Sequence, residues 1–118
     1  MLPERHRLRR NADIRRVHRE GRRWRHPLLI LFVSANNQDA SRFAISVSRR
    51  VGKAVMRNRC RRRVREVIRR RLTDVEPGWD CLFVARTGLP AASFDEIEAA
   101  VDQLFRRSGI YPAATDVR

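Results

Sequence analysis

Arginine carries the chemistry that is most evident in this sequence. Residues 49–71 hold eleven arginines and Lys53 against a single acid, Glu66, which gives the segment a net charge of +11. A guanidinium group binds two phosphate oxygens at once and stacks on bases, whereas a solvated protein surface normally mixes both signs of charge. The run therefore predicts a surface that binds a polyanion.

The residues of a protein-borne active site are not apparent. The three histidines, His6, His18 and His26, have no lysine or carboxylate that the sequence places beside them for acid–base cleavage of RNA. The acids are scattered singly, so no carboxylate cluster for two metal ions is predicted. Cys60 and Cys81 are too few and too far apart for a disulfide scaffold or a zinc site. We expect two buried thiols in a reducing cytosol.

The overall composition is that of one basic globular domain. With 118 residues, a formal net charge of +14 and 42% hydrophobic residues, the chain can form one core. Residues 1–27 carry a net charge of +7, whereas residues 93–118 carry −2. Because the positive charge is concentrated in the first part of the chain, we expect it to form one binding surface. No apolar run approaches the roughly 18–20 residues of a membrane span, and the first ten residues lack the apolar stretch of a secretory signal. We expect a cytoplasmic single domain over residues 1–118, with no membrane partner and with loose ends at 1–8 and 111–118.

Hydrophobic periodicity predicts three helices and four strands. The order is helix, three strands, helix, strand, helix, which is an α+β domain. The expected helices are 11–20, with Asn11 as N-cap and Gly21 as the stop, 55–70, and one that opens at Ser93 in a capping box with Glu96. The expected strands are 22–26, 28–34, 42–48 and 80–85. Along 42–48, large apolar residues alternate with Ala44, Ser46 and Ser48, and this small, polar face leaves room for a ligand.

The helix over 55–70 presents most of the arginines. Its apolar residues recur at helical spacing and form a stripe that packs on the sheet: Met56, Cys60, Val64, Val67 and Ile68. No aromatic residue lies in that stripe to insert into a lipid surface, so nucleic acid is the better partner than a membrane. No helix-turn-helix pair or dimer zipper is present to place the helix in a DNA groove.

Residues 42–66, RFAISVSRRVGKAVMRNRCRRRVRE, resemble the signature of the bacterial ribonuclease P protein subunit. In that family a strand of small residues runs into a basic pair, Val-Gly, Ala-Val, Arg-Asn-Arg and a basic helix that ends in Arg-Glu. Here those elements are Arg49-Arg50, Val51-Gly52, Ala54-Val55, Arg57-Asn58-Arg59 and Arg65-Glu66. The opening segment from Arg7 to Gly21 is similar to the family's first helix, and the resemblance extends to about Tyr111.

The resemblance implies a fold and two RNA-binding regions. The fold is a single-domain α–β sandwich of the ribosomal protein S5 domain 2-like type, in the order α-β-β-β-α-β-α with a left-handed β-α-β crossover. The positions that match the contacts to the catalytic RNA are Arg49, Arg57, Asn58, Arg59, Arg61, Arg62 and Arg65. The positions that match the cleft for the single-stranded 5′ leader of precursor tRNA are Ile14, His18, Phe32, Ser46, Ser48, Arg50, Lys53 and Arg86. The family commonly has aromatic residues where Ile14 and His18 stand, and stacking on unpaired bases is weaker here.

The function that the resemblance implies is removal of the 5′ leader from precursor tRNA. In the family the RNA subunit carries out Mg²⁺-dependent hydrolysis, and one protein subunit binds one RNA and the leader. No protein catalytic residue and no protein metal site are expected, and DNA is not an expected partner. The alternative is a structural RNA-binding protein, such as a ribosomal protein or an RNA chaperone, which would share the charge and fold class. A DNA-binding regulator is a third hypothesis. It is disfavoured because the sequence contains no motif that would place a helix in a DNA groove.

Overall fold

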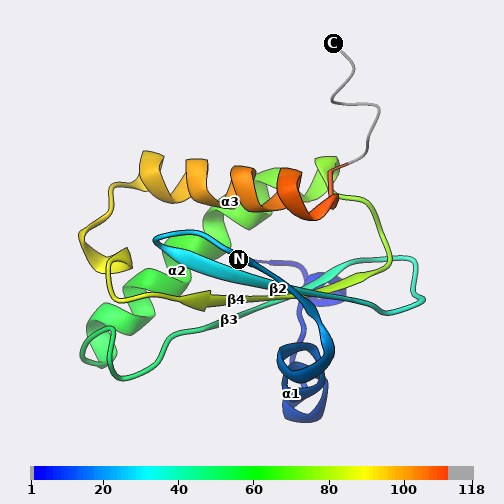
Figure 1. Cartoon of the computed structure of the whole chain (residues 1–118), viewed down its shortest axis with the longest axis horizontal. Helices are drawn as coiled ribbons and strands as arrows, with labels where there is room; N and C mark the ends of the chain where they lie inside the picture. The colour runs from blue at the N-terminus through cyan, green and yellow to red at the C-terminus, as the bar shows by residue number, and fades with distance from the viewer. Residues whose placement is uncertain (1, 112–118) are drawn as a thin grey trace.

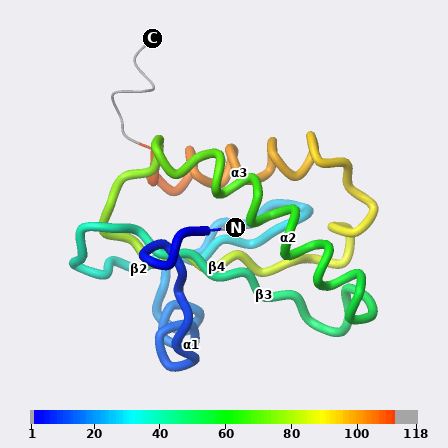
Figure 2. The backbone as a smooth tube through the Cα atoms, turned by 180° about the vertical axis from the view of Figure 1, so that it is seen from behind, coloured from blue at the N-terminus to red at the C-terminus, as the bar shows by residue number. Residues whose placement is uncertain are grey.

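The computed structural model describes residues 2–111, in which one four-stranded sheet lies between helices. Helices α2 and α3 cover one face of the sheet, and α1 lies against the other (Figure 1). Seen from behind, the layers have the same order (Figure 2). The helices are α1 (Asn11–Glu20), α2 (Ala54–Arg71) and α3 (Phe94–Ser108), and the strands are β1 (Arg22–Arg25), β2 (Leu29–Ala35), β3 (Arg42–Ser46) and β4 (Trp79–Ala85). The predicted order of elements is confirmed.

The sheet has the spatial order β1-β2-β4-β3. Strand β2 pairs antiparallel with both β1 and β4, whereas β3 runs parallel to β4. Two parallel neighbours need a crossover connection instead of a tight hairpin, and α2 supplies it. The crossover therefore carries the arginine run from the end of β3 back across the sheet to the start of β4.

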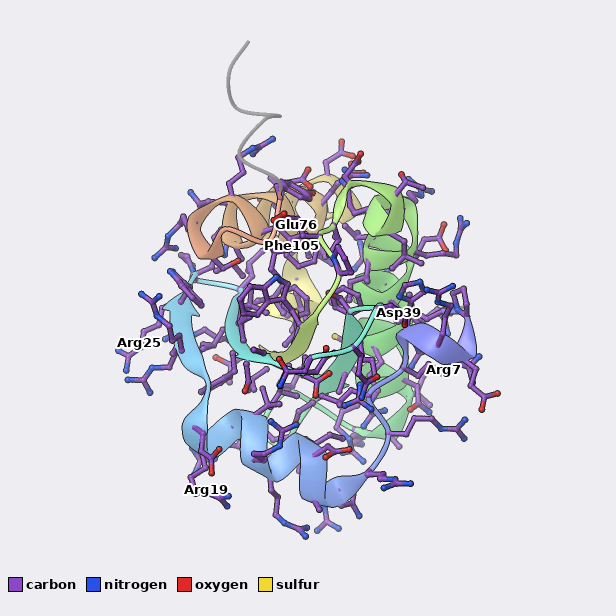
Figure 3. The ribbon with its side chains drawn as sticks, turned by 90° about the vertical axis from the view of Figure 1, so that its right-hand side faces the viewer. Arg7, Arg19, Arg25, Asp39, Glu76 and Phe105 are labelled. Atoms are coloured by element: carbon purple, nitrogen blue, oxygen red, sulfur yellow. The ribbon has the colours of Figure 1, made fainter. Side chains whose placement is uncertain are left out.

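Two apolar clusters hold the layers together. The larger lies between the sheet and the pair α2 and α3, where Phe83 and Phe105 pack with their ring centroids 5.6 Å apart. Figure 3 shows Phe105 between α3 and the sheet. The smaller, on the α1 side, consists of Leu8, Val17, Phe32 and Leu82. Because strand side chains alternate between faces, the expected division of 42–48 is confirmed: Phe43 packs in the larger cluster and Ala44 against the smaller.

The chain ends that the structure describes are packed, and the prediction of loose ends is wrong for them. Leu2 and Leu8 are buried, and the Leu8 N–H donates to the Phe43 carbonyl along the outer edge of β3. Tyr111 packs on Phe105 and donates its hydroxyl proton to Asp102 at 2.6 Å. Residues 112–118 lie outside the described residues. The apolar side chains at these ends cover the core. Local composition does not reveal this contact, because it forms only when the chain has folded.

Two of the three helix ends that the sequence predicted are confirmed. Ser93 caps α3 in the predicted capping box with Glu96. The predicted Asn11 N-cap is wrong, because Asn11 is the first helical residue of α1 and Arg10 holds the cap position without a side-chain bond. Gly21 does end α1, and a Cβ there would lie only 2.5 Å from the Val17 carbonyl oxygen. Glycine thus allows the end of α1 to turn tightly into β1.

Candidate nucleic-acid interface

The first two thirds of α2, residues 54–65, present arginines whose charge no carboxylate neutralises within the described chain. Arg57 donates to the Gly52 carbonyl at 3.0 Å, and Arg61 donates to the Asn58 side-chain oxygen at 2.6 Å. Both acceptors are neutral. The structure gives Arg59, Arg62 and Arg65 no hydrogen bond or ion pair inside residues 2–111, and Arg59 and Arg62 are exposed. This part of the helix is a positively charged face that is open to a polyanion.

The C-terminal end of the same helix, from Glu66 to Arg71, is neutralised. Glu66 accepts hydrogen bonds from Arg69 at 2.6 Å and from Arg70 at 3.1 Å. The bond from Arg69 is the main reason that the pKa of Glu66 falls to about 2. Arg71 reaches across to α3, where it binds Asp102 at 2.8 Å and Glu98 at 2.7 Å. The hydrogen bond to Asp102 is the main cause that raises the pKa of Arg71.

The turn before α2 joins this arginine face to the sheet. Residues 47–53 follow β3, and Arg49, Arg50 and Lys53 are exposed there with no carboxylate partner among residues 2–111. A Cβ on Gly52 would lie 3.1 Å from the Met56 side chain, so glycine lets this turn pack closely on the first turn of the helix. The bond from Arg57 to Gly52 fixes the same junction.

The sheet face on the α1 side has an uncovered apolar strip. Three partly exposed side chains, Ile30, Ala44 and Val84, border the smaller cluster, and the edge of α1 adds Ile14. Their strands adjoin in the order β2, β4, β3, and Figure 1 shows α1 beneath one end of the sheet only. This strip, to which we give the name groove, is an apolar surface that can receive unpaired bases.

The eight leader positions predicted from the sequence fall into three places. Ile14, His18 and Phe32 meet at the edge of α1, where the His18 ring lies 4.7 Å from the Phe32 ring, centroid to centroid. Phe32 is only 6% exposed, so it supports the exposed His18 ring and offers little surface of its own.

The remaining five predicted leader positions lie at the two ends of the groove. Four of them are exposed at the β3 end: Ser46, Ser48, Arg50 and Lys53. Arg86 lies across the sheet beside the β1–β2 turn, where its backbone N–H donates to the Leu28 carbonyl at 3.0 Å. The structure thus brings seven of the eight positions to α1 and the β3 end, and separates Arg86 from them.

A buried carboxylate that sequence reasoning missed locks α1 to the sheet. Asp80 is fully buried and accepts two hydrogen bonds from Arg42, at 2.8 and 2.7 Å, one from Asn36 at 2.9 Å and one from Arg16 at 3.0 Å. Burial by itself would raise the pKa of Asp80, but the hydrogen bonds from Arg42, Asn36 and Arg16 outweigh it and the pKa is lowered.

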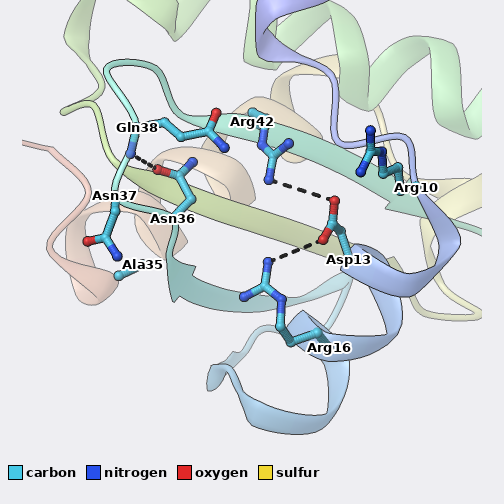
Figure 4. A pocket seen from close by; sticks show the side chains of 8 residues that line it. All are labelled: Arg10, Asp13, Arg16, Ala35, Asn36, Asn37, Gln38 and Arg42. Atoms are coloured by element: carbon cyan, nitrogen blue, oxygen red, sulfur yellow. Dashed lines mark hydrogen bonds and ion pairs between the residues drawn. The ribbon is translucent and has the colours of Figure 1, made fainter.

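Arg16 comes from α1, so this network fixes the helix over the sheet and with it the side chains that border the groove. Above Asp80 lies a polar hollow of about 550 Å³, where Asp13 reaches Arg16 and Arg42 at 3.7 and 3.9 Å (Figure 4). An aspartate at the start of an otherwise apolar strand was the only signal of this network in the sequence.

The other candidate reactive groups either have hydrogen-bond partners in the fold or are buried. His6 Nδ1 lies 2.8 Å from the Ser41 carbonyl oxygen, and the Leu28 N–H donates to His26 Nδ1 at 3.0 Å. Cys60 and Cys81 are buried and unpaired, and burial raises the pKa of each thiol. Within residues 2–111, no three His, Cys, Asp or Glu side chains come together as metal ligands, and no helix is long and apolar enough to cross a membrane.

Comparison with known proteins gives one family. The model of the family described as Ribonuclease P matches residues 2–109. The ribonuclease P protein component of Herpetosiphon aurantiacus is 40% identical over 105 residues, which cover 89% of this chain and 85% of that protein. The RNase P protein from Thermotoga maritima has a TM-score of 0.79 at 30% identity, over 86% of this chain and 96% of that one. The RNase P protein of Staphylococcus aureus shares the fold, with a TM-score of 0.83 at 23% identity over 90% of this chain and 97% of that one.

Proposed function

The chain belongs to the Ribonuclease P protein family and is a protein component of that tRNA-processing endoribonuclease; from this premise we propose how it works. The part of α2 from Ala54 to Arg65 binds the catalytic RNA, and the groove binds the single-stranded 5′ leader of precursor tRNA. One copy of the protein serves one RNA, in the cytoplasm. The observation that carries the proposal is the run of arginines that have no carboxylate partner among residues 2–111 and that continues through the β3–α2 turn to the end of the groove.

The protein's share of the reaction is binding. Guanidinium groups on α2 neutralise the phosphate repulsion between two RNA molecules, and each one can hold two phosphate oxygens. In the groove, Ile14 gives apolar contact to a base and the exposed His18 ring offers a stacking surface. The hydroxyl groups of Ser46 and Ser48 can donate to, or accept from, the leader. These contacts orient the leader so that the scissile phosphodiester lies beside the catalytic RNA.

We assign the hydrolytic chemistry to the RNA subunit. Hydrolysis releases the leader and leaves a 5′ phosphate on the tRNA. The carboxylates of Asp13 and Asp80, which lie between α1 and the sheet, are engaged by Arg16 and Arg42 and do not fit a Mg²⁺ site. When Mg²⁺ is bound by the RNA, it supplies the Lewis-acid chemistry of the step.

Cleavage of a precursor tRNA with a 5′ extension, at low Mg²⁺ and with a bacterial ribonuclease P RNA, tests this proposal. We expect the protein alone to be inert, the RNA alone to be slow, and the two together to cleave rapidly at the mature 5′ end. Tight RNA binding without stimulation would favour a purely structural RNA-binding role. Cleavage by the protein alone would place an active site on the protein and contradict the proposal.

A further inference from the structure

Three rows of paired residues cross strands β2, β4 and β3 on the face of the sheet that carries the groove. The first row is Ser34, Asp80 and Arg42, the second is Phe32, Leu82 and Ala44, and the third is Ile30, Val84 and Ser46. Successive rows are two residues apart along each strand, which is about 7 Å. The first row is polar and holds the Asp80 network, the second packs under α1, and the third belongs to the groove. Helix α1 therefore lies between a polar row and the row that receives the leader.

One buried side chain attaches α1 to the middle row. Of the ten residues of α1, Val17 is the one that is buried, and it packs with Phe32 and Leu82. A single apolar contact fixes one point of a helix but leaves the helix free to roll about its own axis. The orientation of α1 around that axis must therefore be set by another contact.

Arg16 supplies a contact of this kind on the polar side of the helix. Its guanidinium group donates to the Asp80 carboxylate at 3.0 Å and to the Ser34 hydroxyl at 3.4 Å, so it bonds to two members of the first row. Figure 4 shows Arg16 and Asp13 on the side of α1 that faces Arg42. Because the two acceptors belong to neighbouring strands, the bonds of Arg16 hold this side of α1 down on the sheet.

The residues of α1 that border the groove lie on the opposite side of Val17. At about 100° per residue, Arg16 lies about 100° to one side of Val17 around the helix axis. On the other side, His18 lies at about 100° and Ile14 at about 60°. A roll of α1 that released Arg16 would therefore move His18 and Ile14 as well. The His18 ring lies 4.7 Å from the Phe32 ring, centroid to centroid, and this contact reports the orientation of the helix.

We propose that Arg16 is a positioning residue for leader binding, which sets the roll of α1 and thereby holds His18 at the groove. The inference rests on the proposed function, since it needs the leader in the groove. Asp80 also accepts two hydrogen bonds from Arg42 and one from Asn36. It keeps these partners when Arg16 is replaced, so the loss of Arg16 does not leave a buried carboxylate unpaired. The effect on the leader can therefore be separated from an effect on folding.

Binding of the holoenzyme to a precursor tRNA with its leader, and to the same tRNA without a leader, tests this role. The ratio of the two affinities is the gain from the leader. Arg16→Met keeps the length of the side chain and removes its hydrogen bonds. Arg15→Met is the matched control, because it removes the same charge from an exposed neighbour whose side chain makes no hydrogen bond or ion pair within the described chain. We expect Arg16→Met to reduce the gain roughly fivefold, as for a weakened stacking contact, and the control to keep it.

The ring contact gives a second readout, which does not depend on RNA. In the free protein, Arg16→Met should weaken the nuclear Overhauser effect between the His18 and Phe32 rings, whereas Arg15→Met should keep it. Arg16→Lys should give an intermediate gain from the leader, because an ammonium group lacks the planar fork that bonds to two members of the first row at once.

The outcomes separate this proposal from the proposed function. If Arg16→Met weakens the binding of both substrates equally, or keeps the full gain from the leader, Arg16 does not position the groove and the groove proposal stands. If Arg16→Met does not fold, Arg16→Lys decides in its place. A wild-type gain in that variant would overturn the proposal, and a reduced gain with wild-type binding of the leaderless tRNA would support it. If the wild-type protein gains no affinity from the leader, both proposals fail.

Discussion

The two parts of α2, residues 54–65 and 66–71, contain the same kind of residue but have different neighbours. Arg59, Arg62 and Arg65 have no carboxylate partner within residues 2–111, whereas Arg69 and Arg70 bind Glu66, and Arg71 binds two acids of α3. Helix α2 runs obliquely, and its C-terminal end lies beside α3 while its N-terminal end projects beyond it (Figures 1 and 2). Helix α3 carries the acids Glu98 and Asp102 on the side that meets α2.

The difference shows that a basic run in a sequence is not by itself an interface. A guanidinium group that is held by carboxylates has already made its charge-assisted hydrogen bonds, and a phosphate would have to displace them. One that has only neutral neighbours keeps its full attraction for a polyanion. The arginines of α2 therefore divide into a binding group and a fold-stabilising group, and each of the following measurements tests that division.

The largest effect is expected from Arg61→Ala, Arg62→Ala and Arg65→Ala combined. Loss of three phosphate contacts should weaken assembly with the catalytic RNA on the order of a hundredfold. It should also flatten the salt dependence of log K by about 2 to 3, at 0.7 to 0.9 per contact. Filter binding over a range of salt concentrations measures both quantities.

The matched control for that variant is Arg69→Ala with Arg70→Ala. These two arginines are exposed and lie on the same helix, but Glu66 neutralises them. We expect the salt slope of the control to stay close to that of the wild type. An unchanged slope in the triple variant, or an equal loss in the control, would show that the division of α2 is wrong.

A smaller effect, on stability instead of binding, is expected from Arg71→Ala. The substitution leaves Asp102 and Glu98 without their shared cation, and the Asp102 side chain is only 19% exposed. The free energy of unfolding should fall by about 1–3 kcal/mol. Urea unfolding measures this loss, and RNA binding of the folded variant should keep its wild-type salt slope. A loss of slope without a loss of stability would place Arg71 in the binding group.

The smallest effect concerns the pH dependence of the Glu66 pair. Its pKa of about 2 in the folded protein lies below the ordinary 4.5, because Arg69 and then Arg70 donate to the carboxylate. The ion pair therefore contributes its stability above pH 4.5, and the contribution is lost as the pH falls from 4.5 towards 2. Carboxyl NMR titration should show the low pKa, and Glu66→Gln should remove this part of the acid dependence. A Glu66 pKa near 4.5 would mean that Arg69 and Arg70 are free for RNA.

Much of the fold could be predicted because its signals are local. The alternation along 42–48 correctly divided large and small side chains between the two faces of the sheet, and the Ser93–Glu96 capping box marked the start of α3. Helical spacing correctly identified Cys60, Val64, Val67 and Ile68 as buried. The RNA-binding and leader-binding roles of the predicted site residues remain predictions for the measurements above.

What the sequence alone determined is therefore the family, the order of elements and the position of the arginine run. These depend on residue types and on spacings within a few positions of the chain. The tertiary structure decided the rest: which arginines of α2 are neutralised, how Arg16 and Arg42 converge on buried Asp80, and which rows of the sheet lie on either side of α1. Asp80 is 64 residues from Arg16 and 38 from Arg42. Contacts of that range depend on strand order and helix placement, which the folded chain sets through the burial of its core.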